Sequence, residues 1–128
     1  MNDEIIKIKI WGRVLPIKII YDCFEGEEIS EIQKETLSTF MENKDSILDS
    51  AYERLKQFCL YEYTEWYDLF CEDVFKIAMP NALYIKRSIT KKHVIGLLCA
   101  FRPSEEHGLA IYIEDGRPIK IGHQDIIL

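Results

Sequence analysis

Two adjacent residues near the C-terminus, Asp115 and Gly116, constrain the fold of this chain more than any other feature of its sequence. An Asp-Gly pair favours a two-residue β-turn, because both central positions of that turn require a positive φ. On either side of the pair, apolar and polar residues alternate as they do in strands that bury one face. Residues 107–114 and 117–122 are therefore predicted to form an antiparallel hairpin. The return strand is expected to face inward through Ile119 and Ile121.

The segment before this hairpin is apolar on both faces. Residues 94–101 read Val-Ile-Gly-Leu-Leu-Cys-Ala-Phe and contain no charged side chain. Such a run fits a central strand, with helices covering one face and either a partner or a bent part of the sheet covering the other. Gly96 leaves room in this strand for a bulge or for the close approach of another segment.

An alternation of apolar and charged residues predicts two more strands at the N-terminus. In the first, residues 4–11, isoleucine takes every second position in the centre and lysine lies between. The second, residues 14–21, follows a turn at Gly12-Arg13 and contains Pro16. Because proline lacks the N–H group that a strand donates to its neighbour, this strand is expected to lie at a sheet edge or to begin late.

Helical signals fill the middle of the chain. Ser30 and Gln33 have the spacing of a capping box, so a helix is predicted from there to about Glu42. A second helix follows a short break and shows an apolar period of about 3.6 residues. With so short a link, the two helices are expected to pack antiparallel as a hairpin. The apolar face of the second helix is predicted to comprise Ile47, Leu48, Ala51, Tyr52, Leu55, Phe58 and Cys59.

Together these elements predict an α+β fold in a single domain spanning residues 1–128. It should contain an antiparallel sheet of about six strands, an N-terminal hairpin plus a C-terminal meander, packed against the αα-hairpin. The predicted element order is ββααα(short)ββββ. Residues 76–81 are expected to form a connector broken by Pro80, residues 83–87 a strand, and residues 88–92 a turn.

Charge is segregated along the chain, although the net charge is only −6. Residues 22–75 contain fifteen acidic and four basic residues, a net charge of −11, whereas residues 76–102 contain six basic residues and no acidic one. The overall acidity argues against a nucleic-acid partner, while the acidic segment suits a basic protein. The basic residues near the predicted turn are interpreted as a solvated hairpin tip: Lys86, Arg87, Lys91, Lys92 and His93.

Composition also bears on location and cofactors. No apolar run approaches the roughly 20 residues that cross a bilayer, and the N-terminus is acidic where a secretory signal is basic. A cytoplasmic protein without membrane association is therefore expected. The four cysteines lack the C-x-x-C spacing of zinc or redox sites, so we expect free thiols, most of them buried. Neither a metal nor another cofactor is predicted.

The first candidate site is an acidic, aromatic segment within residues 58–75. Its aromatic side chains alternate with carboxylates, a combination that repels phosphate but offers anchors to a basic protein surface. The alternative is structural: the aromatics would close the core in a third short helix, with the acids in solvent. The candidate binding residues are Tyr61, Tyr63, Glu65, Trp66, Tyr67 and Asp68.

The second candidate site lies at the base of the C-terminal hairpin, where antiparallel strands bring two polar segments together. A histidine beside carboxylates has the components of general acid–base catalysis. No H-x-H or H-E-x-x-H spacing indicates a metal, and no base is placed beside a nucleophile, so no catalytic residue is assigned. The alternative is again structural, with these groups bonded to loop backbone. The residues concerned are Glu105, Glu106, His107, His123, Gln124 and Asp125.

Several short motifs resemble a family of small, uncharacterised bacterial domains. They are Glu106-His107-Gly108-Leu109, Asp115-Gly116 and Gly122-x-Gln124-Asp125, preceded by the apolar strand through Gly96. The strand–strand–helix–helix order of the front half is similar too, so the likeness covers most of the chain. The resemblance implies a bacterial cytosolic α+β domain and carries over no activity or catalytic residue. By analogy, small acidic domains of this kind are sometimes suspected of acting as immunity proteins against toxins.

Three functional hypotheses stay open. The favoured one is a non-enzymatic binding protein, such as an immunity-type inhibitor, that contacts a basic protein through the acidic, aromatic segment. The second is a small hydrolase or ligand-binding protein with a polar site at Glu106, His107 and Asp125. The third is an assembly role for the two-faced strand at residues 94–101. The sequence leaves the oligomeric state undetermined.

Overall fold

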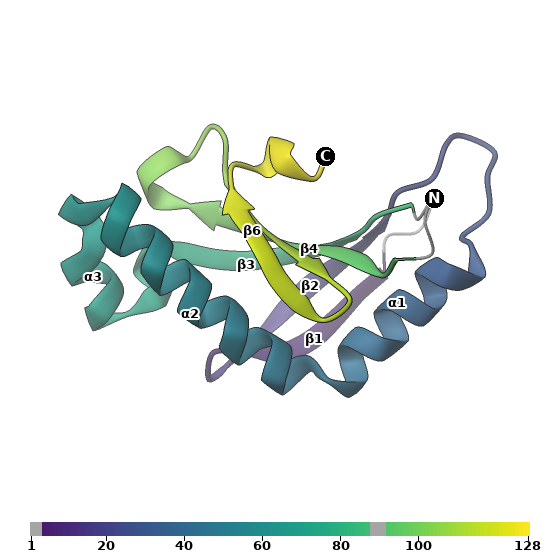
Figure 1. The fold of residues 1–128 in the computed structure, drawn as a ribbon, viewed down its shortest axis with the longest axis horizontal. Helices are drawn as coiled ribbons and strands as arrows, with labels where there is room; N and C mark the ends of the chain where they lie inside the picture. Colours follow the sequence, from purple (N-terminus) through teal and green to yellow (C-terminus); the bar gives the residue numbers. More distant parts are fainter. Residues whose placement is uncertain (1–3, 88–91) are drawn as a thin grey trace.

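The structure, a computed structural model, describes residues 4–87 and 92–128. Within them, six strands form one sheet in sequence order, and the two long helices lie against one of its faces (Figure 1). Neighbouring strands are antiparallel except β2 and β3, which are parallel. The strands are β1 (Glu4–Ile10), β2 (Arg13–Tyr21), β3 (Ala78–Ile85), β4 (Val94–Phe101), β5 (Leu109–Glu114) and β6 (Arg117–Gly122).

The helices complete the predicted element order, so the α+β fold with six strands is confirmed. They are α1 (Glu31–Glu42), α2 (Lys44–Glu62) and the short α3 (Tyr67–Glu72). Single 3-10 turns flank them and end the strands: η1 (Thr64–Trp66), η2 (Val74–Lys76), η3 (Arg102–Ser104) and η4 (Gln124–Ile126). The predicted turn at residues 88–92 falls, except for its last residue, outside the described residues.

The N-terminal hairpin forms as predicted, closed by a two-residue turn at Trp11 and Gly12 with φ of 51° and 88°. The prediction that β2 lies at an edge is wrong, because β2 is between β1 and β3. Pro16 is tolerated there because it faces Lys7 at a position where an antiparallel pair exchanges no hydrogen bonds. Pairing with β3 begins only at Lys18, so Pro16 also costs no bond on that side.

β3 begins earlier than predicted. Residues 78–81 belong to the strand and not to a connector, and Pro80 lies inside it. The register against β4 shifts between Pro80 and Ala82, so a bulge at Asn81 accommodates the missing N–H group. The proline therefore marks an irregularity within a strand.

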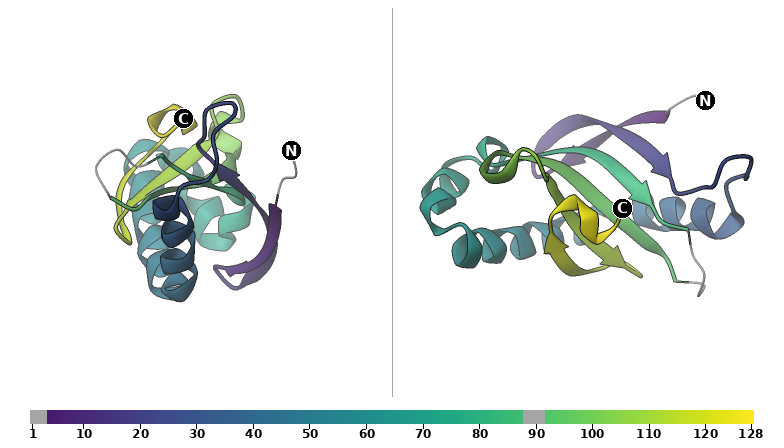
Figure 2. Two further views of the ribbon diagram at one scale, coloured as in Figure 1. Left: turned by 90° about the vertical axis from the view of Figure 1, so that its right-hand side faces the viewer. Right: turned by 90° about the horizontal axis from the view of Figure 1, so that it is seen from above.

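The two long helices occupy the predicted segments but do not form the predicted αα-hairpin. Ser30 caps α1, its hydroxyl oxygen accepting a hydrogen bond from the Gln33 N–H (3.2 Å), and the capping box is complete. Asn43 alone separates α1 from α2, and one residue is too short to reverse a helix axis. The helices therefore diverge from Asn43 as an open V (Figures 1 and 2). The apolar face of α2 is as predicted, with Ile47, Leu48, Ala51, Leu55 and Cys59 buried.

The C-terminal tail covers part of the sheet face opposite the helices. Ile127 is fully buried there, and Lys86 Nζ donates a hydrogen bond to its carbonyl oxygen (2.8 Å). Gly96 permits this contact, because a Cβ at that position would lie 2.5 Å from Ile127 Cδ1. The predicted two-faced central strand is confirmed, and its second face is covered by the chain itself. This smaller core comprises Ala82, Val94, Leu98, Ala110 and Ile127.

The C-terminal hairpin is confirmed as well. Asp115 and Gly116 have φ of 49° and 81°, as the two-residue turn requires. The Asp115 carboxylate also accepts a hydrogen bond from the His93 N–H (2.9 Å), which ties the turn to the start of β4. A register shift after Tyr112 leaves Ile119 38% exposed, so the prediction that it faces inward is wrong.

All four cysteines are free thiols, as predicted. Cys59 and Cys99 are buried, but Cys23 is half-buried and Cys71 exposed, so only half of them are buried rather than most. Burial raises the pKa of Cys59 to about 11 and also raises the pKa of Cys99. The folded chain therefore holds both thiol protons more tightly than the unfolded chain does.

We expect the free energy of unfolding to fall as the pH rises above 9. An unfolded cysteine loses its proton near pH 9.0, whereas Cys59 keeps it to about pH 11, so above pH 9.0 the unfolded chain binds fewer protons. Between about pH 8 and about pH 10.5, Cys59 alone should lower the free energy of unfolding by roughly 2 kcal/mol. Urea titrations at about pH 8 and about pH 10.5 would measure the decrease. Cys59→Ala should show a smaller decrease, and an equal one in both chains would contradict this assignment.

Candidate functional site

The predicted acidic, aromatic segment spans the end of α2, η1 and α3. Tyr63 packs edge-on against Phe101 with ring centroids 5.1 Å apart, and Tyr67 stacks on Phe70 at 6.2 Å. Phe101 and Phe70 are buried, so these two tyrosines help to close the core. For Tyr63 and Tyr67, the structure therefore agrees with the alternative that the aromatic side chains of this segment close the core.

The other predicted residues of the segment are more open. The Arg102 guanidinium lies 5.7 Å from the centroid of the Trp66 ring, a cation–π contact between η1 and η3. Tyr61 is 74% exposed, the most open of the four aromatic candidates. Glu65 and Asp68 are exposed as well. The structure thus leaves one aromatic and two acidic candidates free for contact.

A hollow of about 550 Å³ opens beside α2, next to the turn of the N-terminal hairpin. Trp11 and Tyr52 form aromatic walls, with ring centroids 5.9 Å apart and ring planes at 68°. Asp49 and Glu53 are both exposed and lie one helical turn apart on α2. We call this site, completed by Val74, the acidic hollow. It combines two aromatic rings with two carboxylates, groups that attract a cation.

Trp11 has an unusual backbone conformation. Its φ of 51° lies in the left-handed region, which costs a tryptophan energy. Two contacts offset the strain: the indole Nε1–H donates a hydrogen bond to the Leu48 carbonyl oxygen (2.9 Å), and the ring packs on Tyr52. They hold the hairpin turn against α2 and fix one wall of the acidic hollow. Sequence reasoning missed Trp11, because nothing local indicates a contact with a helix that begins so much later.

The acidic hollow extends toward α3. A hydrogen bond with Cys71 raises the pKa of Tyr67, and burial, Tyr52 and Glu53 add to the shift. Tyr52 and Tyr67 both pack on the Phe70 ring, with centroids 5.4 and 6.2 Å away, so the hollow and the predicted segment adjoin. Asp68 follows Tyr67 directly and carries the negative charge further along it.

One basic group approaches the same cluster. The Arg13 guanidinium lies 4.3 Å over the Phe75 ring, which packs against Trp11 at 6.3 Å. Its charge offsets part of the negative potential on that side. The more strongly acidic direction is therefore away from Arg13, toward α3.

The structure brings part of the second candidate site together at the base of the C-terminal hairpin. His107 and His123 stack, with ring centroids 4.7 Å apart and ring planes at 14°. The Gln124 N–H donates a hydrogen bond to the His107 carbonyl oxygen (3.1 Å). Gln124 also packs on Gly108, where φ is 63° and a Cβ would lie 2.6 Å from Gln124 Nε2. These contacts lock the two ends of the hairpin.

The carboxylates of this second site are solvent-exposed. They belong to Glu105, Glu106 and Asp125. In residues 4–87 and 92–128, no three or more His, Cys, Asp or Glu side chains are grouped as a metal site would require. The second site therefore consists of two stacked imidazole rings beside a backbone hydrogen bond, with exposed carboxylates around them.

A third polar cluster, around His93, was not indicated by the sequence. His93 Nδ1 lies 2.8 Å from Thr36 Oγ1, and the buried Thr36 hydroxyl also donates to the Ile32 carbonyl oxygen (2.7 Å). Because a hydroxyl has one hydrogen, the two contacts favour the tautomer in which His93 Nδ1–H donates. His93, directly before β4, is thus half-buried against α1, so the prediction that it lies in a solvated hairpin tip is wrong. Lys91, predicted beside it, lies outside the described residues.

These features define an α+β domain whose mostly antiparallel sheet carries helices on one face and the C-terminal tail on the other. A family model described as a domain of unknown function (DUF6985) matches residues 2–128, so the chain belongs to this family. Neither a curated protein nor a solved structure matches the chain significantly. None of the helices in residues 4–87 and 92–128 has the length and apolar composition that a membrane-spanning helix requires.

Proposed function

We propose that this chain is a non-enzymatic binding protein that holds a basic protein partner on the acidic side of α2 and α3. The observation that carries the proposal is the acidic hollow, where Asp49 and Glu53 accompany the rings of Trp11 and Tyr52. A lysine or arginine side chain entering it would meet aromatic faces and carboxylates at once. Further exposed acids follow on η1 and α3, namely Glu65, Asp68 and Glu72, the last of which is paired with Lys76.

The aromatic candidates have different parts in this proposal. Tyr61 is exposed at the end of α2, but it lines a separate hollow with Arg54 and Lys120, so it would contact the partner only at the margin of the surface. Tyr63, Trp66 and Tyr67 are half-buried by their contacts with the fold, so they would support the surface. Anchors of this kind, ringed by charged side chains, are common at protein interfaces.

We further propose that the chain acts in the bacterial cytoplasm as an immunity-type inhibitor. Small size, acidity and four free thiols support this role, since unpaired cysteines are usual in a reducing compartment. A basic toxin would be steered to the acidic side from a distance, and the hollow would fix its orientation on contact.

Titration with a tetra-arginine peptide, followed by NMR of the isotope-labelled protein, tests the acidic hollow. We expect the Trp11 indole N–H signal and the amide signals of Asp49, Tyr52 and Glu53 to move with added peptide. Raising the salt concentration to about 0.5 M should weaken binding, because the charges are exposed to screening. Neutralising the hollow with Asp49→Asn and Glu53→Gln should weaken it about tenfold, equivalent to about 1.4 kcal/mol.

A matched control distinguishes binding in the hollow from the general attraction of a basic peptide to an acidic protein. Glu28→Gln with Glu35→Gln removes the same charge from exposed positions before and on α1. This control should change the affinity by less than about twofold, as expected for screened charges at a distance. If both double variants lose affinity equally, the hollow has no special role and the proposal fails.

A further inference from the structure

β1 is an outer strand of the sheet, and its far side carries no strand in the described part of the chain. The opposite outer strand, β6, is supported by α2, and the Arg54 guanidinium donates a hydrogen bond to the Ile119 carbonyl oxygen (2.6 Å). β1 packs along only one side, against β2, and Figure 2 shows it at the margin of the molecule. Unlike β6, it presents an open backbone edge.

The register identifies the free backbone groups of this edge. Ile10 and Arg13 flank the two-residue turn and form a hydrogen-bonded pair, as such a turn requires. The bonding to β2 then recurs at every second residue, so the N–H and C=O groups of the intervening residues face away from β2. Those residues are Ile5, Lys7 and Lys9. A seventh strand would find three residues of free ladder there.

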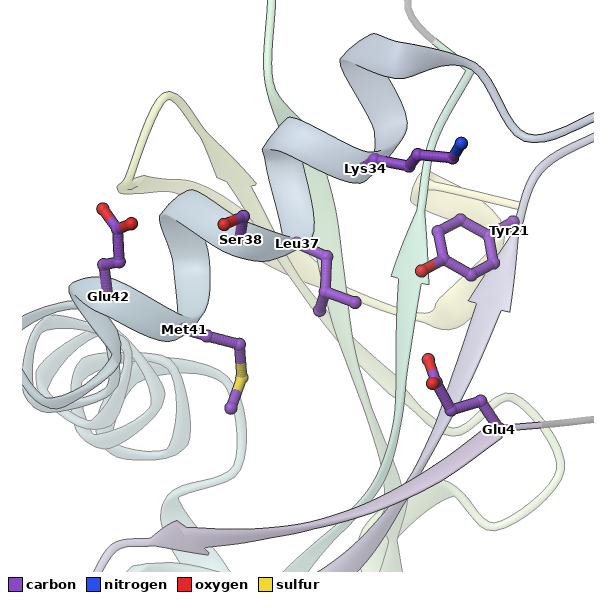
Figure 3. A pocket seen from close by; sticks show the side chains of 7 residues that line it. All are labelled: Glu4, Tyr21, Lys34, Leu37, Ser38, Met41 and Glu42. Atoms are coloured by element: carbon purple, nitrogen blue, oxygen red, sulfur yellow. The ribbon is translucent and has the colours of Figure 1, made fainter.

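A hollow of about 580 Å³ lies beside this edge, between the sheet and α1 (Figure 3). Leu37 and Met41 of α1 supply its apolar side, and both are half-buried. Glu4 and Tyr21 lie across from them at the start of β1 and the end of β2 (Figure 3). The Glu4 carboxylate and burial together raise the pKa of Tyr21, burial being the larger cause. Lys34, Ser38 and Glu42 of α1 also line the hollow, so its apolar part is confined to Leu37 and Met41. An edge strand beside a helix, with such a space between them, is the geometry in which extended peptides bind by adding a strand.

The charge pattern of β1 selects among the strands that could be added. Lys7 and Lys9 are exposed on the sheet face opposite the helices, together with Ile5, which is 64% exposed. Residues placed directly opposite them on an added strand would face the same way, so acidic side chains there would form cross-strand pairs. A second copy of β1 would bring lysines against lysines, which disfavours self-association.

We propose that the β1 edge binds an extended segment of a partner protein in which acidic and apolar residues alternate. The acidic residues lie against Lys7 and Lys9, and an apolar residue enters the hollow at Leu37 and Met41. Main-chain hydrogen bonds to β1 provide the common part of the affinity, and the alternating side chains provide the selectivity. This site is separate from the acidic hollow and does not depend on the function proposed there.

A seven-residue peptide alternating glutamate with valine or leucine, blocked at both ends and equal in length to β1, is the probe. Amide hydrogen exchange measured by NMR should show protection of the Ile5, Lys7 and Lys9 amides on its addition, since these face solvent in the free protein. The same peptide with N-methyl groups on the residues that would donate to β1 should bind at least about tenfold more weakly, because each methyl group removes one hydrogen-bond donor of the added strand.

Charge reversal supplies the control on the protein side. Lys7→Glu with Lys9→Glu should weaken binding of the glutamate peptide about fivefold and favour a lysine–valine peptide instead, as expected for two cross-strand charge pairs. The Trp11 indole signal should be unchanged in this variant and would show that the hairpin is intact. Unchanged exchange rates at all three amides with saturating peptide would overturn the proposal. Lys7 and Lys9 would then serve only to prevent the edge from pairing with other strands.

Discussion

Replacing Gln33 by leucine should lower the free energy of unfolding by about 3 kcal/mol. Gln33 is 2% exposed, and its Nε2 donates hydrogen bonds to the carbonyl oxygens of Asp22 and Ile85 (3.0 and 3.2 Å). Its Oε1 accepts the Ser30 N–H (3.1 Å). One side chain thus joins the start of α1, the end of β2 and the end of β3. Leucine would fill the space but leave the Asp22 carbonyl and the Ser30 N–H without the amide, while the Ile85 carbonyl would keep only its bond from the Asp22 N–H (2.9 Å).

Urea denaturation of purified variants would measure this loss. Gln33→Glu should be at least as unstable at neutral pH, because a carboxylate cannot donate to either carbonyl and would be buried with its charge. Gln57→Leu is the matched control, since Gln57 is exposed on α2 and its change should stay within about 0.5 kcal/mol. Equal effects of leucine at the two positions would show that the buried amide does not hold these segments together.

Replacing Gly96 by valine should cost about 2–3 kcal/mol through overpacking against the C-terminal tail. A Cβ at Gly96 would lie 2.5 Å from Ile127 Cδ1 and 3.2 Å from its Cγ2, so the buried Ile127 side chain must move. The tail is held at the same place by the bond from Lys86 Nζ to the Ile127 carbonyl oxygen. The expected result is a weakened tail on an otherwise intact sheet.

A double-mutant cycle makes this prediction specific. Ile127→Ala alone should cost about 2–4 kcal/mol because it empties a buried site. In the double variant, the valine at position 96 partly fills the space that Ile127→Ala empties. Its loss in the free energy of unfolding should therefore be about 1–2 kcal/mol smaller than the sum of the two single losses. Strict additivity, measured by urea denaturation, would mean that the two residues do not meet in solution.

The features that could be predicted are those whose causes lie close together in the sequence. The Asp115-Gly116 turn depends on two adjacent residues, and the capping box on Ser30 and Gln33, three positions apart. The apolar strand through Gly96 was recognisable because its composition alone excludes solvent on either face. In each case the local preference and the final structure agree.

The features that were missed depend on contacts between distant segments. The capping-box spacing predicts a cap role for Gln33, but its two carbonyl acceptors, at Asp22 and Ile85, follow or lie in separate strands. The sequence pattern predicts Trp11 at the end of a strand, whereas its contact with α2 follows from where that helix lies in the fold. The acidic, aromatic segment was found from composition, but which of its rings are free depends on Phe70 and Phe101. Composition therefore indicates the acidic, aromatic segment but not the hollow beside it.

The parallel pair of β2 and β3 has a consequence for the order of folding. The two strands pair only over residues 18–21 and 82–85, and both long helices lie between them in the chain. The N-terminal hairpin and the β3–β6 meander can each form from near neighbours, whereas uniting them requires closing a long loop. We expect amides of residues 18–21 to gain exchange protection late in refolding. Two small sheets would then become one only after the helices between them have formed.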